Sequence, residues 1–126
     1  MVLVVEDDPG IQLTVRLSLE VGGFAVEVVS SAEEALDVID DVAPSAILLD
    51  ISLPGMDGWA FLERLRSDGR LAQVGVVVMS AHVSHEVAAQ AEAAGAAGHL
   101  SKPFDVDELI ETVGRVAAQR PEPPSR

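Results

Sequence analysis

The amino-acid sequence predicts a single α/β domain, a three-layer sandwich with a parallel sheet of five strands and with five helices. Short apolar runs alternate with helical patterns along the chain, which is typical of βαβ units. The runs are continuously apolar, as expected of strands that a parallel sheet buries on both faces. A chain of 126 residues suits one domain and can bury about two-thirds of its unfolded surface.

Each predicted strand is a short apolar run next to turn or polar residues. Because only 3% of the residues are aromatic, the core is expected to be aliphatic. The predicted strands are residues 2–5, 25–29, 46–49, 74–79 and 98–100, of which the last has the weakest pattern.

Apolar residues spaced three or four apart predict helices. Ser31 and Glu34 have the spacing of a capping box, and so do Asp105 and Glu108. The stripes are Ala32, Ala35, Leu36 and Ile39; Phe61, Leu62 and Leu65; and Val106, Leu109, Ile110 and Val113.

The segment from Ile11 to Val21 gives conflicting signals. Its apolar residues alternate with polar ones, which favours a strand. However, Asp8-Pro9 is a good helix start, Gly22-Gly23 is a good stop, and an eleven-residue strand would be long. We predict a helix.

The domain is expected to span residues 1–118, with residues 119–126 as a proline-rich disordered tail or linker stub. The N-terminal run resembles neither a signal peptide nor a membrane span. The absence of cysteine excludes a disulfide framework and fits a cytoplasmic location. A formal charge of −13 makes direct binding to nucleic acid or an anionic membrane improbable on electrostatic grounds and would attract cations or a basic partner.

Polar residues follow four of the predicted strands. Glu6 and Asp7 follow the first, Asp50 the third, Ser80 the fourth and Lys102 the fifth. Ligands of such sheets bind outside the carboxyl ends of the strands, so these side chains are expected to meet there. Clustered carboxylates repel one another unless a cation intervenes, and Mg²⁺ prefers oxygen ligands. Asp50 could then attack a phosphoryl group whose charge Lys102 and the metal neutralise.

Four motifs follow one another at specific intervals. Asp7 precedes Asp50 by 43 residues, whereas Ser80 follows it by 30 and Lys102 by 52. The motifs are Val-Val-Glu6-Asp7-Asp8, Leu-Leu-Asp50-Ile-Ser-Leu-Pro54-Gly-Met-Asp57-Gly58, Val-Met-Ser80-Ala81 and Ser101-Lys102-Pro103-Phe104. With them, the chain resembles the receiver domains of response regulators in two-component signalling, from Val2 to about Ala118.

The resemblance implies a flavodoxin-like fold with strand order 2-1-3-4-5 and a Mg²⁺ site in which Mn²⁺ is expected to substitute. Asp7 would be a direct metal ligand, and Glu6 would assist through water. Asp50 and the backbone carbonyl of Ser52 would complete the protein ligands. Asp50 would also be the phosphorylation site.

The resemblance further implies a switch made of Ser80 and Lys102, which would turn toward the phosphoryl group. Lys102-Pro103 would be a cis peptide. The family often has Tyr or Phe three residues before the lysine, where this chain has His99. His99 is therefore the expected third switch residue, with an altered way of transmitting the signal.

The resemblance implies that the protein is a phosphoacceptor switch. It would not be an enzyme, because it would catalyse only its own phosphorylation and dephosphorylation. A histidine kinase or phosphotransfer protein would supply the phosphoryl group. The face of the fourth helix, fifth strand and fifth helix would then change its affinity for an unknown output partner. The domain would be a monomer or a weak homodimer.

Other interpretations remain open. A binding module that does not depend on phosphorylation would not need the acid–Ser–Lys set. A phosphohydrolase would commonly have an acid at Ser52, and a flavodoxin would have a less acidic first loop. Asp8 is expected to cap a helix, Asp57-Gly58 to form a turn and Trp59 to be partly buried packing. A zinc site from His82, His85 and His99 fits no ligand spacing.

Overall fold

The computed structural model describes residues 1–81 and 84–119, and within them the predicted alternation of five strands with five α-helices is confirmed. The elements are β1 (Val2–Val5), α1 (Pro9–Val21), β2 (Val26–Val29), α2 (Ala32–Val42), β3 (Ala46–Asp50), α3 (Gly58–Ser67), the short 3-10 helix η1 (Arg70–Ala72), β4 (Gly75–Ser80), α4 (His85–Ala93), β5 (Gly98–Ser101) and α5 (Val106–Gln119).

The sheet has the order β2-β1-β3-β4-β5, and every neighbouring pair is parallel, as predicted. The carboxyl ends of the strands therefore lie along one rim. In the pairing register, Asp50 lies opposite Met79, and Ser80 lies opposite Ser101. The register thus brings the ends of β3, β4 and β5 to similar heights.

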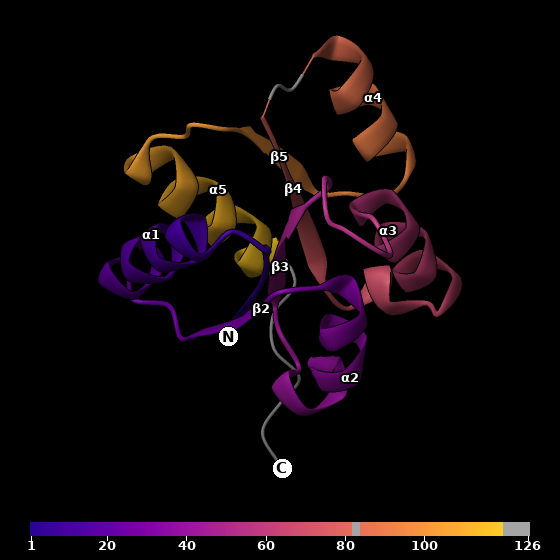
Figure 1. The fold of residues 1–126 in the computed structure, drawn as a ribbon, viewed down its shortest axis with the longest axis horizontal. Coiled ribbons are helices and arrows are strands. Elements are labelled where there is room, and N and C mark those ends of the chain that lie inside the picture. Colours follow the sequence, from indigo (N-terminus) through magenta and orange to yellow (C-terminus); the bar gives the residue numbers. More distant parts are fainter. Residues whose placement is uncertain (82–83, 120–126) are drawn as a thin grey trace.

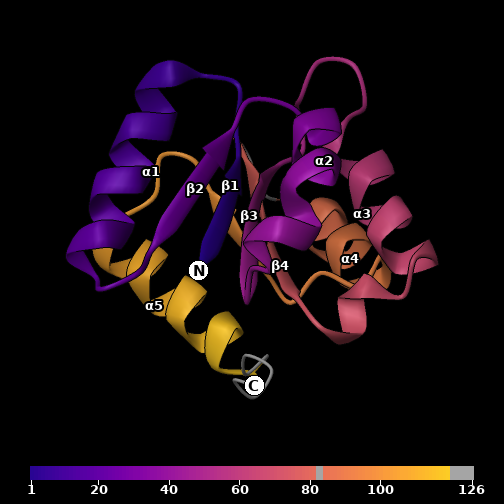
Figure 2. The ribbon, with the colours of Figure 1, turned by 90° about the horizontal axis from the view of Figure 1, so that it is seen from below.

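Helices cover both faces of the sheet: α1 and α5 lie on one side, and α2, α3 and α4 lie on the other (Figures 1 and 2). Successive strand residues point to opposite faces, so Leu3 joins the core under α2 and α3 whereas Val4 joins the core under α1 and α5. All residues of β1, β3 and β4 are buried, which confirms the prediction of strands buried on both faces. Each fully buried Val or Leu stabilises the fold by about 1.5–3 kcal/mol.

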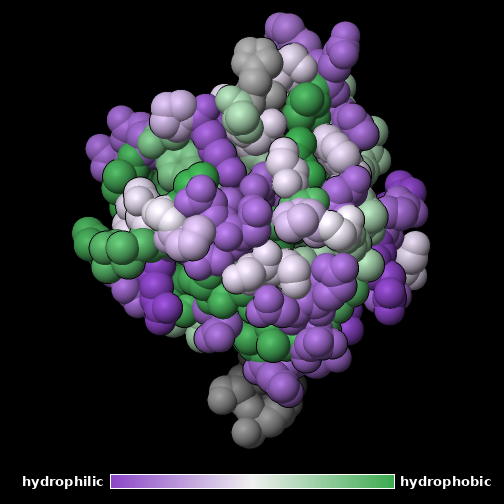
Figure 3. Space-filling view, viewed as in Figure 1, coloured by the Kyte–Doolittle hydropathy of each residue, from purple (hydrophilic) through white to green (hydrophobic). Residues whose placement is uncertain are grey.

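The segment with conflicting signals is helix α1. The Asp8 carboxylate accepts hydrogen bonds from the N–H groups of Gly10 (2.8 Å) and Ile11 (3.1 Å), which caps the helix. Val15 and Leu19 are buried against the sheet. The alternating apolar residues thus form two helical stripes, and the second stripe, which consists of Leu13, Leu17 and Val21, is exposed. Figure 3 shows hydrophobic residues at the surface on the side where α1 lies, next to a mostly hydrophilic face.

Several predicted boundaries were wrong by one residue. β2 begins at Val26 rather than at residue 25, β4 spans Gly75–Ser80 rather than residues 74–79, and β3 and β5 each continue by one residue. The cap of α2 is confirmed, since the Ser31 hydroxyl accepts the N–H of Glu34 (3.1 Å).

At α5 the Asp105 carboxylate accepts the N–H of Asp107 (2.8 Å) rather than that of Glu108. The helix runs to Gln119, the first residue of the predicted tail, and the remaining tail residues lie outside the described part of the chain. None of the helices in residues 1–81 and 84–119 has the length and apolar character needed to cross a membrane.

Candidate functional site

Three carboxylates meet at the carboxyl ends of β1 and β3, as predicted. Glu6 and Asp7 follow β1, and Asp50 is the last residue of β3. One carboxylate oxygen from each lies within 4.8 Å of the other two. Glu6 is 1% exposed and Asp50 is 4% exposed, whereas Asp7 is exposed to solvent. The cluster is therefore a buried acidic pair with one solvent-facing acid.

Lys102 joins this cluster from the segment after β5. Its ammonium group donates a 2.9 Å hydrogen bond to Glu6 Oε2 and lies 3.3 Å from Asp50 Oδ2. The Lys102–Pro103 peptide bond is cis, as expected from the resemblance. The predicted meeting of acids and lysine is therefore present.

Burial and neighbouring charges shift the pKa values of both Glu6 and Lys102. Burial raises the pKa of Glu6, and the nearby Asp50 charge adds to this, although the hydrogen bond from Lys102 opposes it. Burial by itself would lower the pKa of Lys102, but the Glu6 hydrogen bond and the Asp50 charge outweigh it, so the pKa is raised. Lys102 therefore remains a cation at neutral pH and offsets part of the carboxylate repulsion.

Backbone groups orient the two buried carboxylates. The Ser52 N–H donates to Asp50 Oδ1 (2.9 Å), and the Asp8 N–H donates to Glu6 Oε1 (3.2 Å). Asp50 thus has one oxygen on a backbone donor and the other near Lys102. The Asp8 side chain caps α1, as predicted, rather than joining the cluster.

A glycine allows the loop after Asp50 to fold tightly. A Cβ atom on Gly58 would lie 2.3 Å from the Ile51 Cα and 2.9 Å from the Asp50 carbonyl oxygen. The Gly58 N–H donates to the Ile51 carbonyl (3.2 Å), and the Asp57 carboxylate caps α3 through the N–H of Ala60 (2.9 Å). The pair predicted as turn residues therefore also holds the start of α3 against the residues at the site.

Two further side chains hold the loops of the site, and sequence reasoning missed both. Glu33 of α2 accepts a hydrogen bond from the Met56 N–H (3.3 Å) in the β3–α3 loop. The Gln12 side-chain amide donates to the Glu6 carbonyl and to the Ser30 hydroxyl. The Glu33–Met56 and Gln12–Ser30 contacts join residues 23 and 18 positions apart in the sequence, and no local pattern marks Glu33 or Gln12.

Ser80 and His99 occupy different surroundings. Ser80 is the buried last residue of β4; the cap of α4 is Ser84, whose hydroxyl accepts the N–H of Val87 (3.2 Å). His99 is exposed on β5, where it lines a groove together with His85. His82, the third member of the disfavoured zinc triad, lies outside the described residues.

The acidic cluster fits a hard divalent cation. Its side-chain donors are all carboxylate oxygens, which Mg²⁺ prefers, and the exposed Asp7 leaves a side open to water. Within residues 1–81 and 84–119, these three residues are the one group of at least three His, Asp or Glu close enough to share a metal ion.

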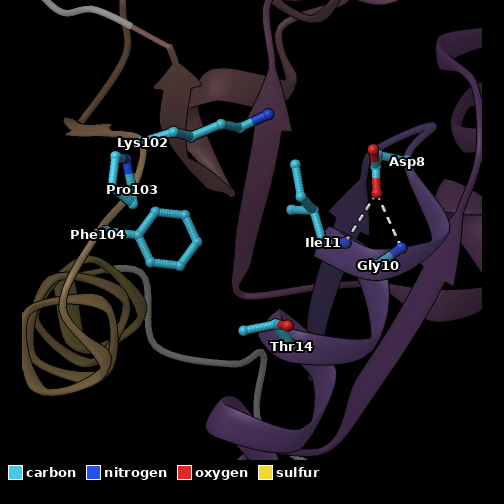
Figure 4. Close-up of a pocket in the computed structure, with 7 residues that line it drawn as sticks. All are labelled: Asp8, Gly10, Ile11, Thr14, Lys102, Pro103 and Phe104. Atoms are coloured by element: carbon cyan, nitrogen blue, oxygen red, sulfur yellow. Dashed lines mark hydrogen bonds between the residues drawn. The ribbon is translucent and has the colours of Figure 1, made fainter.

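A cavity of about 540 Å³ opens beside Lys102, between the start of α1 and the β5–α5 loop. Figure 4 shows the Phe104 ring facing Ile11 across this cavity, with the Lys102 side chain along one edge. Asp8, Gly10, Thr14 and Pro103 also line it, and most of its wall is apolar. A partner that reaches the acidic cluster from this side would meet an apolar contact surface.

The match to known proteins covers nearly the whole domain. Residues 2–114 match the response regulator receiver domain family. The chain is 36% identical over 119 residues to "Response regulator Rre1" of Synechocystis sp., a match that covers 94% of this chain and 52% of that protein. It is 35% identical over 112 residues to "DNA-binding transcriptional regulator NtrC" of Klebsiella pneumoniae, which covers 89% of this chain and 24% of that protein.

Solved structures of receiver domains have the same fold as this chain. The receiver domain of the Francisella response regulator 1452 superimposes with a TM-score of 0.87 at 30% identity, covering 94% of this chain and 96% of that one. The chain spans about half the length of Rre1 and about a quarter of that of NtrC. The similarity therefore concerns one domain of those longer proteins.

Proposed function

The chain belongs to the response regulator receiver family, and we propose that it takes a phosphoryl group from a histidine kinase or phosphotransfer protein onto Asp50 in the cytoplasm. The observation that supports this proposal most is the meeting of Asp50 with two further carboxylates and the Lys102 ammonium at one rim of the sheet. A binding module without phosphoryl chemistry would have no need to bury this set.

In the proposed reaction, one oxygen of Asp50 forms a bond to phosphorus while the bond between phosphorus and the donor nitrogen breaks. The donor imidazole leaves with the electron pair of that bond. Ser52 N–H holds Oδ1 of Asp50 and Lys102 lies beside Oδ2, so the carboxylate is oriented before the donor arrives.

Glu6, Asp7, Asp50 and the Ser52 carbonyl would hold Mg²⁺, which when bound supplies positive charge for the phosphoryl oxygens. Lys102 supplies a second positive charge from the protein itself. Because Lys102 pairs mainly with Glu6 before the reaction, it must turn toward the new phosphoryl group. This exchange of partners is the first step of the proposed switch.

Ser80 and His99 would carry the change outward. Ser80 ends β4 beside Ser101 in the pairing register, so a turn of its hydroxyl toward the phosphoryl group would shift the loop that leads to α4. The face of α4, β5 and α5, which includes His99, would then change its affinity for an output partner. This is a population shift between two conformations.

The phosphodonor is expected to dock over the cavity of Figure 4. This cavity lies beside Lys102 and has an apolar wall of Ile11 and Phe104, so a donor helix could bury side chains there while its phosphohistidine reaches Asp50.

A small phosphodonor tests the proposal directly. Phosphoramidate with Mg²⁺ should phosphorylate the protein, a chelator should prevent this, and Asp50→Asn should abolish it. Asp57→Asn is the matched control, because this exposed acid caps α3 outside the cluster, and it should still be labelled. Undiminished labelling of Asp50→Asn would overturn the assignment.

A further inference from the structure

The β3–α3 loop, whose Ser52 carbonyl is a proposed metal ligand, is fixed at both of its ends. At its start, the Ile51 N–H donates to the Met79 carbonyl of β4 (3.2 Å), and the Ser52 N–H donates to Asp50 Oδ1 (2.9 Å). At its end, the Gly58 N–H donates to the Ile51 carbonyl (3.2 Å). The two ends therefore meet, and the residues between them form a closed loop beside the acidic cluster.

The middle of this loop has few contacts of its own. Pro54 has no N–H group, and Gly55 has a φ of +73°, a left-handed conformation that favours glycine. Both residues are exposed to solvent, and Met56 is half-buried. In the part of the chain that the structure describes, one hydrogen bond ties these three residues to another element. The Met56 N–H donates it to Glu33 Oε2 of α2 (3.3 Å).

The Glu33 carboxylate lies against the middle of the loop. Besides accepting the Met56 N–H, its Oε2 atom would be 3.0 Å from a Cβ atom on Gly55. Figure 2 shows this loop beside the start of α2, the helix that carries Glu33. The side chain thus connects α2 to the part of the loop that its fixed ends leave unsupported.

The start of α2 is a firm support for this contact. Ala32 and Ala35 are completely buried in the core, and the Ser31 hydroxyl caps the helix through the Glu34 N–H (3.1 Å). Glu33 lies in the first turn, where the helix dipole favours a negative charge. Glu34 is in the same turn, but among the described residues its carboxylate has no hydrogen-bond or ion-pair partner. The two neighbouring acids therefore differ in their contact with the loop.

We infer that Glu33 is a positioning residue for the phosphorylation site. Its carboxylate holds the β3–α3 loop so that the Ser52 carbonyl stays beside the acidic cluster, which makes Mg²⁺ bind more tightly. The inference rests on the proposed function and adds to it a residue outside the cluster. A hydrogen bond to a charged acceptor is stronger than a neutral one, but water competes for the exposed Glu33. Loss of this acceptor should therefore weaken Mg²⁺ binding about threefold.

Three substitutions separate the acceptor from its charge. Glu33→Ala removes both, whereas Glu33→Gln removes the charge but keeps an oxygen that can accept the Met56 N–H. Glu34→Ala removes the same charge one residue along. Calorimetric titration of the intact protein with Mg²⁺ should show about threefold weaker binding for Glu33→Ala. Glu33→Gln should recover part of this loss, and Glu34→Ala should bind Mg²⁺ nearly as the wild type does.

Two further measurements distinguish positioning of the loop from a general loss of structure. By NMR, the Met56 amide should exchange with water faster in Glu33→Ala than in the wild type or in Glu34→Ala. Phosphoramidate labelling of Asp50 in Glu33→Ala should need about threefold more Mg²⁺ to reach half of its maximal rate, with the maximal rate unchanged. A general loss of structure would lower the maximal rate instead.

Three outcomes would overturn the inference: a wild type that binds no Mg²⁺, equal Mg²⁺ affinities of Glu33→Ala and Glu34→Ala, or no recovery in Glu33→Gln. Labelling of Asp50 is measured separately. If Asp50 is not labelled but Mg²⁺ binding responds to Glu33 as described, the proposed function fails and the role of Glu33 in holding the loop stands. If Asp50 is labelled and Mg²⁺ binding does not respond to Glu33, the reverse holds.

Discussion

Lys102 and Glu6 are 96 positions apart in the sequence, yet their ammonium and carboxylate groups form a 2.9 Å hydrogen bond that closes the acidic cluster. The ammonium group thus lies beside two almost completely buried carboxylates, Glu6 and Asp50, to which Asp7 adds a third negative charge. The folded protein therefore contains unfavourable charge repulsion at this site. The first two predictions follow from this balance.

Asp50→Asn should stabilise the protein when Mg²⁺ is absent. The substitution removes one of three crowded negative charges but keeps an oxygen that can accept the Ser52 N–H. We expect the free energy of unfolding to rise by about 1 kcal/mol, the size of the Coulomb repulsion between two like charges a few ångströms apart in a highly polar medium. Urea unfolding with a chelator present measures this. Mg²⁺ should stabilise the wild type more than the variant, and a less stable metal-free variant would contradict the prediction.

Lys102→Ala should destabilise the protein, because it leaves Glu6 and Asp50 without their ammonium partner. Complete removal of a partner from a buried pair costs about 3–5 kcal/mol, and since Lys102 is partly exposed we expect about 2 kcal/mol. Mg²⁺ should recover part of this loss. Arg66→Ala is the control, because it breaks an exposed ion pair with Glu63 and should cost at most about 1 kcal/mol. Equal losses in the two variants would count against a special role of Lys102.

Gly58→Ala should strongly destabilise the domain, since the new methyl group would lie 2.3 Å from the Ile51 Cα. Backbone must move to relieve this overlap, and a loss above about 3 kcal/mol is expected. Gly114→Ala in α5 is the matched control. Its methyl group would meet only Phe24 at 3.6 Å, so it should raise stability by about 0.5–1 kcal/mol. Similar melting temperatures for the two variants would contradict this close packing.

The ion pair between Arg70 and Asp40 should make stability depend on acid pH. The Arg70 hydrogen bond lowers the pKa of Asp40 below its usual value of 3.8. A lowered folded-state pKa contributes stability above the unfolded-state value, and this contribution is lost as pH falls through the folded-state value. Asp40→Asn should therefore lower the melting temperature at neutral pH. The difference in melting temperature between the variant and the wild type should vanish at pH values well below the folded-state pKa of Asp40. Asp41→Asn, one residue along, is the control, and this exposed substitution should leave the melting temperature at neutral pH nearly unchanged.

Much of the fold could be predicted because its signals are local. A run such as Val2–Val5 is apolar throughout, and Asp8 and Ser31 cap helices through N–H groups two or three residues away. The strict alternation in α1 was ambiguous because it also gives two helical stripes, one of them exposed. Strand ends were less predictable, since whether residues such as Ser80 extend a strand depends on the neighbouring strand.

The composition of the site could be predicted, but not its internal pairing. Acids at the ends of β1 and β3 must meet at one rim of a parallel sheet. The preference of Lys102 for Glu6 depends on side-chain distances of a few tenths of an ångström. The support from Glu33 depends on where the β3–α3 loop lies, which no local pattern specifies.

The cluster takes its residues from the carboxyl end of β3 and from the segments that follow β1 and β5, and the backbone between Glu6 and Lys102 includes almost the whole domain. An unfolded chain does not hold these groups in one place. A phosphodonor should therefore label only molecules in which β1, β3 and β5 have all reached their places in the sheet. The amount of label would then count native molecules in a mixture, and a cell that reads this signal would not respond to misfolded copies.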